Sequence, residues 1–198
     1  MKNTFGFSVI ELIVVIAVIG IISTVSYSFY EGRREQALAD LMWTDLKTIE
    51  GSINTFAKDE GIDEWWLQSD FGSTGANDDP TIEEISSQTD FRKYLATVPK
   101  PDHDGLGDYS YDNDYGLVAN DSYNPTICNS SNRPRGINLQ ISFSGSNSVA
   151  SAAFSRVDEK YDNNNSNCGK VTIVTASGVT TLYYHIARSV TDYPSTID

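Results

Sequence analysis

Residues 7–30 read FSVIELIVVIAVIGIISTVSYSFY, an apolar stretch that carries a single charged side chain, Glu11. A helix of about 24 residues is long enough to cross the hydrocarbon layer of a membrane. The stretch is too long for the apolar core of a general secretory signal peptide, and no A-x-A-like cleavage site follows it closely. A plain membrane anchor fits the length but leaves Glu11 unexplained, because an ionised carboxylate within a span costs about 2–3 kcal/mol.

The same helix is predicted to continue from Tyr30 to about Glu60 with an amphipathic pattern, and Gly61 is a good helix stop. A helix over this whole length would be about 80 Å long. Its first half has no apolar partner within one chain, so it needs lipid or other subunits, whereas its second half needs a sheet to cover its apolar side. The apolar positions of that second half are Leu38, Leu41, Met42, Ile49, Ile53, Phe56 and Ala57.

The rest of the 198-residue chain is polar and acidic, with a formal net charge of −13. Such a charge repels phosphate backbones, so direct nucleic-acid binding is not expected. The sequence also shows no catalytic constellation, because His103 and His185 have no visible nucleophile partner and no phosphate-binding glycine loop is present. We therefore predict that the protein is not an enzyme.

The segment 61–108 is expected to connect the helix to a sheet. Thr81 followed by Glu84 resembles a capping box and predicts a short helix, and a further turn is expected over Phe91–Ala96. Alternation and turn residues then predict strands over the remaining chain. The predicted strands are Tyr109–Tyr111, Tyr115–Ala119, Ile137–Phe143, Val149–Val157, Val171–Thr175 and Val179–Ile186, the last two forming a C-terminal hairpin.

These elements predict an α+β fold, in which a long N-terminal helix packs its amphipathic half on an antiparallel sheet. The expected organisation is a short N-terminal segment at 1–6, a transmembrane helix at 7–30, its amphipathic half at 31–60, a connecting segment at 61–108, and a sheet with a surface region at 109–198.

The N-terminus carries a specific resemblance. A short leader that ends in Gly6, followed by Phe7, an apolar run and Glu11 four positions after the phenylalanine, resembles the class III signal of type IV pilins and pseudopilins. In that family a prepilin peptidase cuts after the glycine and methylates the new N-terminal amine. The resemblance implies that Phe7 becomes the first residue, that the precursor lies in the cytoplasmic membrane, and that the mature chain joins a homo-oligomeric surface filament.

The resemblance implies a role for Glu11 in subunit assembly. The new amine on Phe7 and the carboxylate of Glu11 would both be desolvated in a filament core, so pairing between neighbouring subunits would fix the register. The leading function is a pilus-like filament for adhesion, motility or surface contact. The alternatives are a pseudopilin of a type II secretion-like apparatus and a membrane-anchored binding domain that does not polymerise.

The chain departs from the family at Ser28, where many pilins have a proline, and its first proline is Pro80. Family helices often melt between that position and a glycine that corresponds to Gly20. Here Gly20 and the run at 23–26 are the alternative weak points, because glycine and β-branched residues are poor helix formers.

The two cysteines, Cys128 and Cys168, lie in no C-x-x-C motif and far from both histidines. With an exported chain they predict one disulfide, the alternative being two buried free thiols. By resemblance to pilins, the segment between them is a surface region. Separately, Asp102, Asp104 and Asp108 form an acidic, glycine-rich loop that is a candidate for calcium, although a solvated turn is the simpler interpretation. No other cofactor is predicted.

Overall fold

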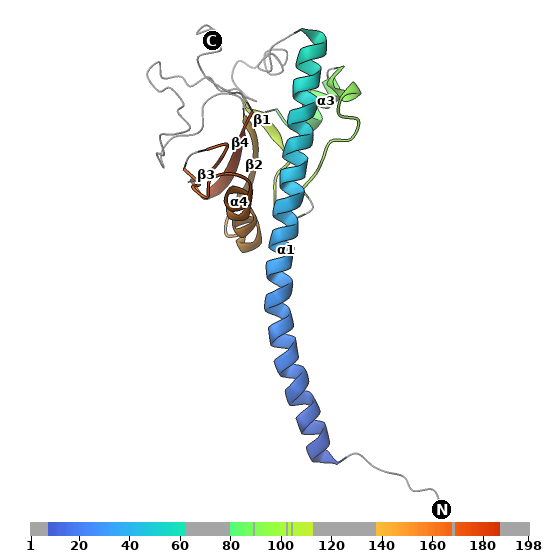
Figure 1. The fold of residues 1–198 in the computed structure, drawn as a ribbon, viewed down its shortest axis with the longest axis vertical. Helices are drawn as coiled ribbons and strands as arrows, with labels where there is room; N and C mark the ends of the chain where they lie inside the picture. Colours follow the sequence, from blue (N-terminus) through green and yellow to red (C-terminus); the bar gives the residue numbers. More distant parts are fainter. Residues whose placement is uncertain are drawn as a thin grey trace, which may run out of the picture.

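In the computed structural model, the chain is described at residues 8–61, 80–88, 90–101, 103, 105–112, 138–167 and 169–186. Helix α1 (Val9–Glu60) is a single element of 52 residues, and Figure 1 shows its N-terminal half extending as a stalk from a head built around its C-terminal half. Gly61 ends the helix in the left-handed conformation, with φ 65°, and its N–H bonds to the carbonyl of Ala57. Both predicted ends of the helix are therefore confirmed to within two residues.

The helix does not break in the region where the sequence suggested weak points. The backbone is α-helical through Gly20 and on through Ser28. The hydroxyl of Thr24 bonds back to the carbonyls of Gly20, at 3.1 Å, and Ile21, at 2.8 Å. These bonds satisfy the hydroxyl within the helix itself, so it presents no unsatisfied donor to an apolar environment.

The described residues of the head form an antiparallel sheet of four strands in the order β1-β2-β4-β3, which bears out the predicted α+β arrangement. The bounds are Ser110–Asp112 for β1, Asn138–Ser144 for β2, Val171–Ala176 for β3 and Val179–His185 for β4. The C-terminal hairpin turns at Ser177 and Gly178, which both have positive φ, 52° and 79°. Two successive positive φ values are those of a type I′ turn, whose twist suits a two-residue hairpin.

One predicted strand is wrong. The segment that begins at Val149 forms helix α4 (Ser148–Tyr161), not a strand. Its buried residues are Ala150, Ala153, Phe154, Val157 and Asp158, a helical rather than a two-residue spacing. Asn147 caps the helix, because its side chain accepts a hydrogen bond from the Ala150 N–H at 3.0 Å. The predicted strand Tyr115–Ala119 lies outside the described residues.

The short elements predicted before the sheet are confirmed. Helix α3 (Ile82–Gln88) starts with the expected capping box, in which the Thr81 N–H donates to Glu84 Oε2 at 2.8 Å and the Glu84 N–H donates to Thr81 Oγ1 at 3.2 Å. A 3-10 helix, η1 (Asp90–Lys93), follows at the predicted turn. In Figure 1, α3 lies on the side of α1 that faces away from the sheet.

The core lies where α1 meets the sheet, α4 and the α3 region. Most of the predicted apolar positions on α1 are buried, but Leu41 is 40% exposed. Leu46, which the predicted stripe omitted, is fully buried, and the acidic residue Asp45 is only 9% exposed. The buried face of α1 is therefore rotated slightly from the predicted one and includes a carboxylate.

Chain segments cover both edges of this sheet. Along β1, the Tyr109 carbonyl accepts from the Ile82 N–H, and the Tyr111 N–H donates to the Pro80 carbonyl. Along β3, the Ile173 N–H donates to the Ser166 carbonyl at 2.8 Å. Covered edges present fewer free backbone groups to another chain.

Candidate processing and assembly site

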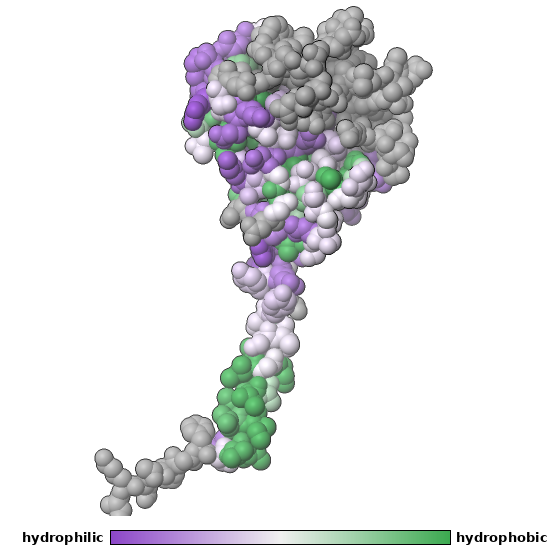
Figure 2. Space-filling view, turned by 180° about the vertical axis from the view of Figure 1, so that it is seen from behind, coloured by the Kyte–Doolittle hydropathy of each residue, from purple (hydrophilic) through white to green (hydrophobic). Residues whose placement is uncertain are grey.

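The stalk is an apolar surface with nothing packed on it. Its large apolar side chains between residues 9 and 30 are each at least 47% exposed. Figure 2 shows a continuous hydrophobic zone over the lower part of this stalk, with a paler segment between that zone and the head. Over the described residues, α1 is the one helix long and apolar enough to cross a membrane, with a mean hydropathy of 2.6 in its most apolar window. A surface of this kind is stable only in lipid or against other protein chains.

Glu11 lies in the first turn of α1, at the tip of the stalk. Its Oε2 accepts a hydrogen bond from the Ser8 N–H at 2.9 Å. Ser8 is the N-cap residue, so the carboxylate satisfies a backbone donor that the helix leaves unpaired and faces the positive end of the helix dipole. This contact directs the charge toward the N-terminal end of the helix.

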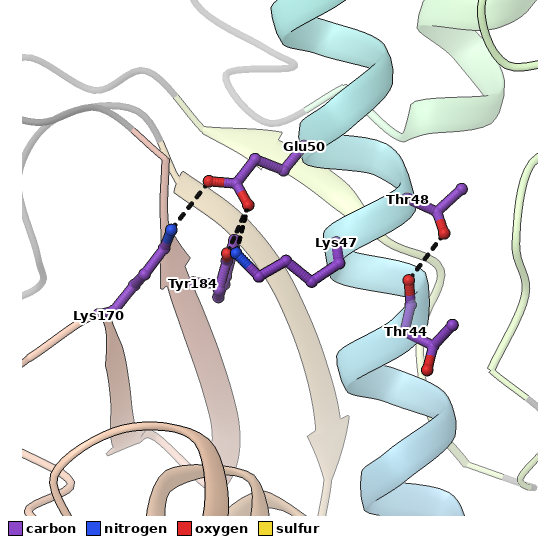
Figure 3. A network of polar contacts seen from close by, with 6 residues as sticks. All are labelled: Thr44, Lys47, Thr48, Glu50, Lys170 and Tyr184. Carbon is purple, nitrogen blue, oxygen red and sulfur yellow. Dashed lines mark hydrogen bonds and ion pairs between the residues drawn. The ribbon is translucent and has the colours of Figure 1, made fainter.

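The sheet is fixed to the C-terminal half of α1 by Glu50, whose side chain is 13% exposed. Its Oε2 accepts from Lys47 Nζ at 2.8 Å and from the Tyr184 hydroxyl at 2.6 Å, and its Oε1 accepts from Lys170 Nζ at 2.9 Å. Figure 3 shows these donors converging on Glu50 from β4, from the chain before β3 and from α1 itself. Burial alone would raise the pKa of Glu50, but the three hydrogen bonds outweigh burial and lower that pKa.

On another side of α1, the same figure shows hydroxyls that bond within the helix. Thr44 Oγ1 donates to the carbonyl of Asp40 and Thr48 Oγ1 donates to that of Thr44, both at 2.8 Å. Thr55 Oγ1 repeats the contact with the carbonyl of Gly51. These threonines are exposed, whereas the bonds to Lys170 and Tyr184 come from the side of α1 that carries Glu50.

Two further ion pairs tie α1 to α4. Arg156 Nη2 lies 3.0 Å from Glu35 Oε2, and Lys160 Nζ lies 2.7 Å from Asp40 Oδ1. The Tyr161 hydroxyl also donates to Asp40 Oδ1, and the Tyr161 ring stacks on Trp43 with centroids 4.5 Å apart. These contacts join the head to α1 just above the apolar stalk.

The other predicted site residues stay predictions. Gly6 and Phe7 lie outside the described residues, as do both cysteines, Cys128 and Cys168. Of the acidic loop, Asp102 and Asp104 also lie outside them, whereas Asp108 is exposed just before β1. Within the described ranges, no group of three or more acidic, histidine or cysteine side chains gathers to hold a metal. A calcium-dependent rise in the melting temperature, absent in EDTA, is the measurement that tests the predicted loop.

Sequence reasoning missed Asp45 and Glu50 as structural residues, because both occupy positions that an amphipathic pattern assigns to solvent. The one available signal was chemical: Glu50 lies three residues after Lys47, a spacing at which helical side chains pair. Nothing near Asp45 in the sequence points to Tyr109, its partner 64 positions away.

Comparison with known proteins bears on the N-terminus. Residues 1–27 match the family described as the prokaryotic N-terminal methylation motif. Neither a curated protein nor a solved structure matches the chain significantly. The match includes Gly6, Phe7 and Glu11, and it continues through most of the exposed apolar segment. The chain therefore carries the class III prepilin leader of type IV pilins and pseudopilins, on a membrane-anchored precursor with a pilin-like α+β fold.

Proposed function

We propose that this protein is the structural subunit of an extracellular type IV pilus-like filament, cleaved after Gly6 and assembled through α1 for adhesion, motility or surface contact. The observation that carries this proposal is the stalk: an exposed apolar helix with one carboxylate at its tip, continuous with the part of α1 on which the head is built. A non-polymerising anchor would need only the apolar length, and in it Glu11 would serve only to cap the first turn of the helix through the Ser8 N–H.

If the protein leaves the membrane, the apolar side chains of its stalk need another apolar environment in place of lipid. Burying one Val, Leu or Ile side chain fully is worth about 1.5–3 kcal/mol, and the stalk exposes many of them. Bundling the stalks of neighbouring copies covers this surface and leaves the heads outside. The strong negative charge of the chain, −13 in total, then keeps the outer surface hydrated.

Glu11 supplies the register in this assembly. In a dry bundle the carboxylate cannot rely on the Ser8 N–H alone, because one hydrogen bond does not compensate a buried charge. The amine that cleavage creates on Phe7 of a neighbouring copy is a cation at the matching depth. Pairing the two neutralises both charges, and any other stagger leaves each of them buried alone.

The decisive measurement is the intact mass of material sheared from the cell surface. We expect a main component that begins at Phe7 and carries one added methyl group. Recovery of this processed form only in membranes would indicate a pseudopilin and not a pilus subunit. An unprocessed chain in membranes would indicate an anchor that does not polymerise.

A paired comparison of variants tests the role of Glu11. Glu11→Ala is expected to insert in the membrane and undergo cleavage normally but to yield few or no filaments. Glu31→Ala removes a carboxylate from the same helix beyond the apolar segment and should assemble as the wild type does. Normal filaments from Glu11→Ala would show that assembly does not depend on Glu11.

A further inference from the structure

The end of the head nearest the stalk consists of three segments joined to one another and to α1 by hydrogen bonds. Arg34 Nη2, on α1, lies 3.1 Å from His103 Nδ1, and His103 Nε2 lies 3.3 Å from Asn147 Oδ1, just before α4. The Gly145 N–H donates at 2.9 Å to the Gly178 carbonyl, in the turn between β3 and β4. We call this surface the base of the head. Its described residues are 103, 105–107, 144–149 and 176–180.

The base lies beside the point at which the apolar stalk ends. The hydrocarbon layer of a membrane is about 30 Å thick, which a helix crosses in about 20 residues, so a span that starts at Val9 ends near residue 28. Tyr27, Phe29 and Tyr30 are each at least 64% exposed at this level. Aromatic side chains are typical of the boundary between hydrocarbon and headgroups. Figure 2 shows a paler segment here, between the hydrophobic zone and the head.

Arg33 and Arg34 bring two guanidinium groups to the level of the lipid headgroups. They follow the last aromatic residue of the stalk by about 5 Å along the helix axis, and the headgroup layer is about 5–8 Å thick. Both are exposed, and among the described residues neither forms an ion pair with a carboxylate. By contrast, Arg156, Lys160 and Lys170 all pair with carboxylates of α1.

The base differs in charge from the chain as a whole. The chain has a net charge of −13, yet the described residues of the base include no acidic side chain. On α1 at the same level, Glu31 is exposed, whereas Glu35 lies 3.0 Å from Arg156. Two arginines therefore stand against Glu31 alone, and this surface can approach a negatively charged layer that would repel the rest of the chain.

We propose that, in the membrane-anchored precursor, the base of the head rests on the lipid surface and that Arg33 and Arg34 bind lipid phosphates. A guanidinium presents a planar fork of donors that matches a phosphate group. Arg34 uses Nη2 to donate to His103, which positions its side chain at the edge of the base. The contact holds α1 at one depth and the head in one orientation. It concerns the precursor only, so its failure would leave the proposed filament untouched.

The surface chemistry of the base suits lipid headgroups better than a protein partner. Among its described residues, Val179 is the one large apolar side chain that is exposed, at 36%. Its segments 144–149 and 176–180 consist mainly of serine, glycine and other small residues. The centre of a protein interface is instead apolar and aromatic. Since α1 runs unbroken from the stalk into the head, insertion of the stalk brings the base to the membrane with no further movement.

The position of the base is tested with the full chain in nanodiscs of phosphatidylcholine and phosphatidylglycerol. A small fraction of the lipid carries a nitroxide on its headgroup, and the chain is labelled with ¹⁵N-glycine. We expect the amide signals of Gly145 and Gly178 to be broadened strongly. Gly61, at the opposite end of the head, is the internal control and should stay sharp. Signals from the base that are as sharp as that of Gly61 would overturn the proposal.

The role of the arginines is tested by amide hydrogen exchange of segments 144–149 and 176–180. Protection in these nanodiscs should exceed that in maltoside micelles, which offer no phosphate. In nanodiscs, Arg33→Gln should lower this protection about fivefold, the effect of one basic residue at an anionic surface. Arg92→Gln removes an exposed cation from η1, away from the base, and should behave as the wild type does. In micelles the three proteins should exchange alike, which shows that the variants are folded.

Three results would contradict the phosphate contact. Wild-type protection that is equal in nanodiscs and micelles would show that lipid does not cover the base. An equal loss in Arg33→Gln and Arg92→Gln would show that only the total charge matters. Protection of the base that is absent in nanodiscs but present in sheared filaments would assign the surface to contacts between subunits.

Discussion

The hydroxyl of Tyr109 donates a hydrogen bond of 3.0 Å to Oδ2 of Asp45, across 64 positions of sequence. The contact joins the chain just before β1 to the buried face of α1. Burial raises the pKa of Asp45 more than the bond from Tyr109 lowers it. Burial and the charge of Asp45 also raise the pKa of Tyr109, so the phenol keeps its proton and donates over the whole useful pH range.

Removing the Tyr109 hydroxyl is expected to lower the free energy of unfolding. Tyr109→Phe keeps the ring in the core but leaves the Asp45 carboxylate without its hydrogen bond, which should destabilise the fold by about 1–3 kcal/mol. Chemical denaturation in detergent measures the change. The matched control is Tyr161→Phe, which removes a bond to the more exposed Asp40 and should cost less than about 1 kcal/mol. Equal losses in the two variants would contradict a special role for the buried bond.

Glu50 should make stability depend on pH. Its pKa is lowered in the folded chain, so its contribution is present above its ordinary pKa of 4.5 and is lost as the pH falls through the lowered folded value. Glu50→Gln is expected to destabilise the chain by about 1–3 kcal/mol near neutral pH, because three donors lose a charged acceptor. The difference from the wild type should shrink in acid. A difference that is constant across the pH range would contradict this account.

The stability of the C-terminal hairpin should depend on the backbone conformation of its turn. Gly178 has a φ of 79°, and a Cβ added there would meet no heavy atom within 4 Å, so Gly178→Ala adds no clash and tests backbone conformation alone. We expect a loss of about 1 kcal/mol, because alanine resists positive φ. Gly51→Ala, on the exposed surface of α1 where φ is helical, is the opposite control and should stabilise by up to about 1 kcal/mol.

The proposed disulfide between Cys128 and Cys168 has a direct test. Intact mass with and without a thiol-blocking reagent should show no free thiol in the purified chain. On the chain-entropy account, a bridge closing a loop of about 40 residues stabilises by about 4 kcal/mol, so reduction should lower the melting temperature markedly. Two thiols that react after unfolding without reductant would establish the alternative of buried free cysteines.

The error at α4 shows what local patterns leave open. Val149 to Val157 contains alternating apolar and small residues that also fit a strand, whereas Ala150, Ala153, Phe154 and Val157 fit one side of a helix. Asn147 offers the cap, and alanine is a strong helix former. The choice between the two patterns depends on what the segment packs against, and here α1 offers Trp43, Glu35 and Asp40 to one helical face.

The sequence alone determined the parts of this protein that follow from local order: the apolar stalk, its end at Gly61, the C-terminal hairpin and the leader with Glu11. Each depends on residues close in the chain or on one continuous period. Tertiary structure alone decided that Asp45 and Glu50 are buried acids with partners. Those outcomes depend on Tyr109, Lys170 and Tyr184, which reach them only after the sheet has packed on α1.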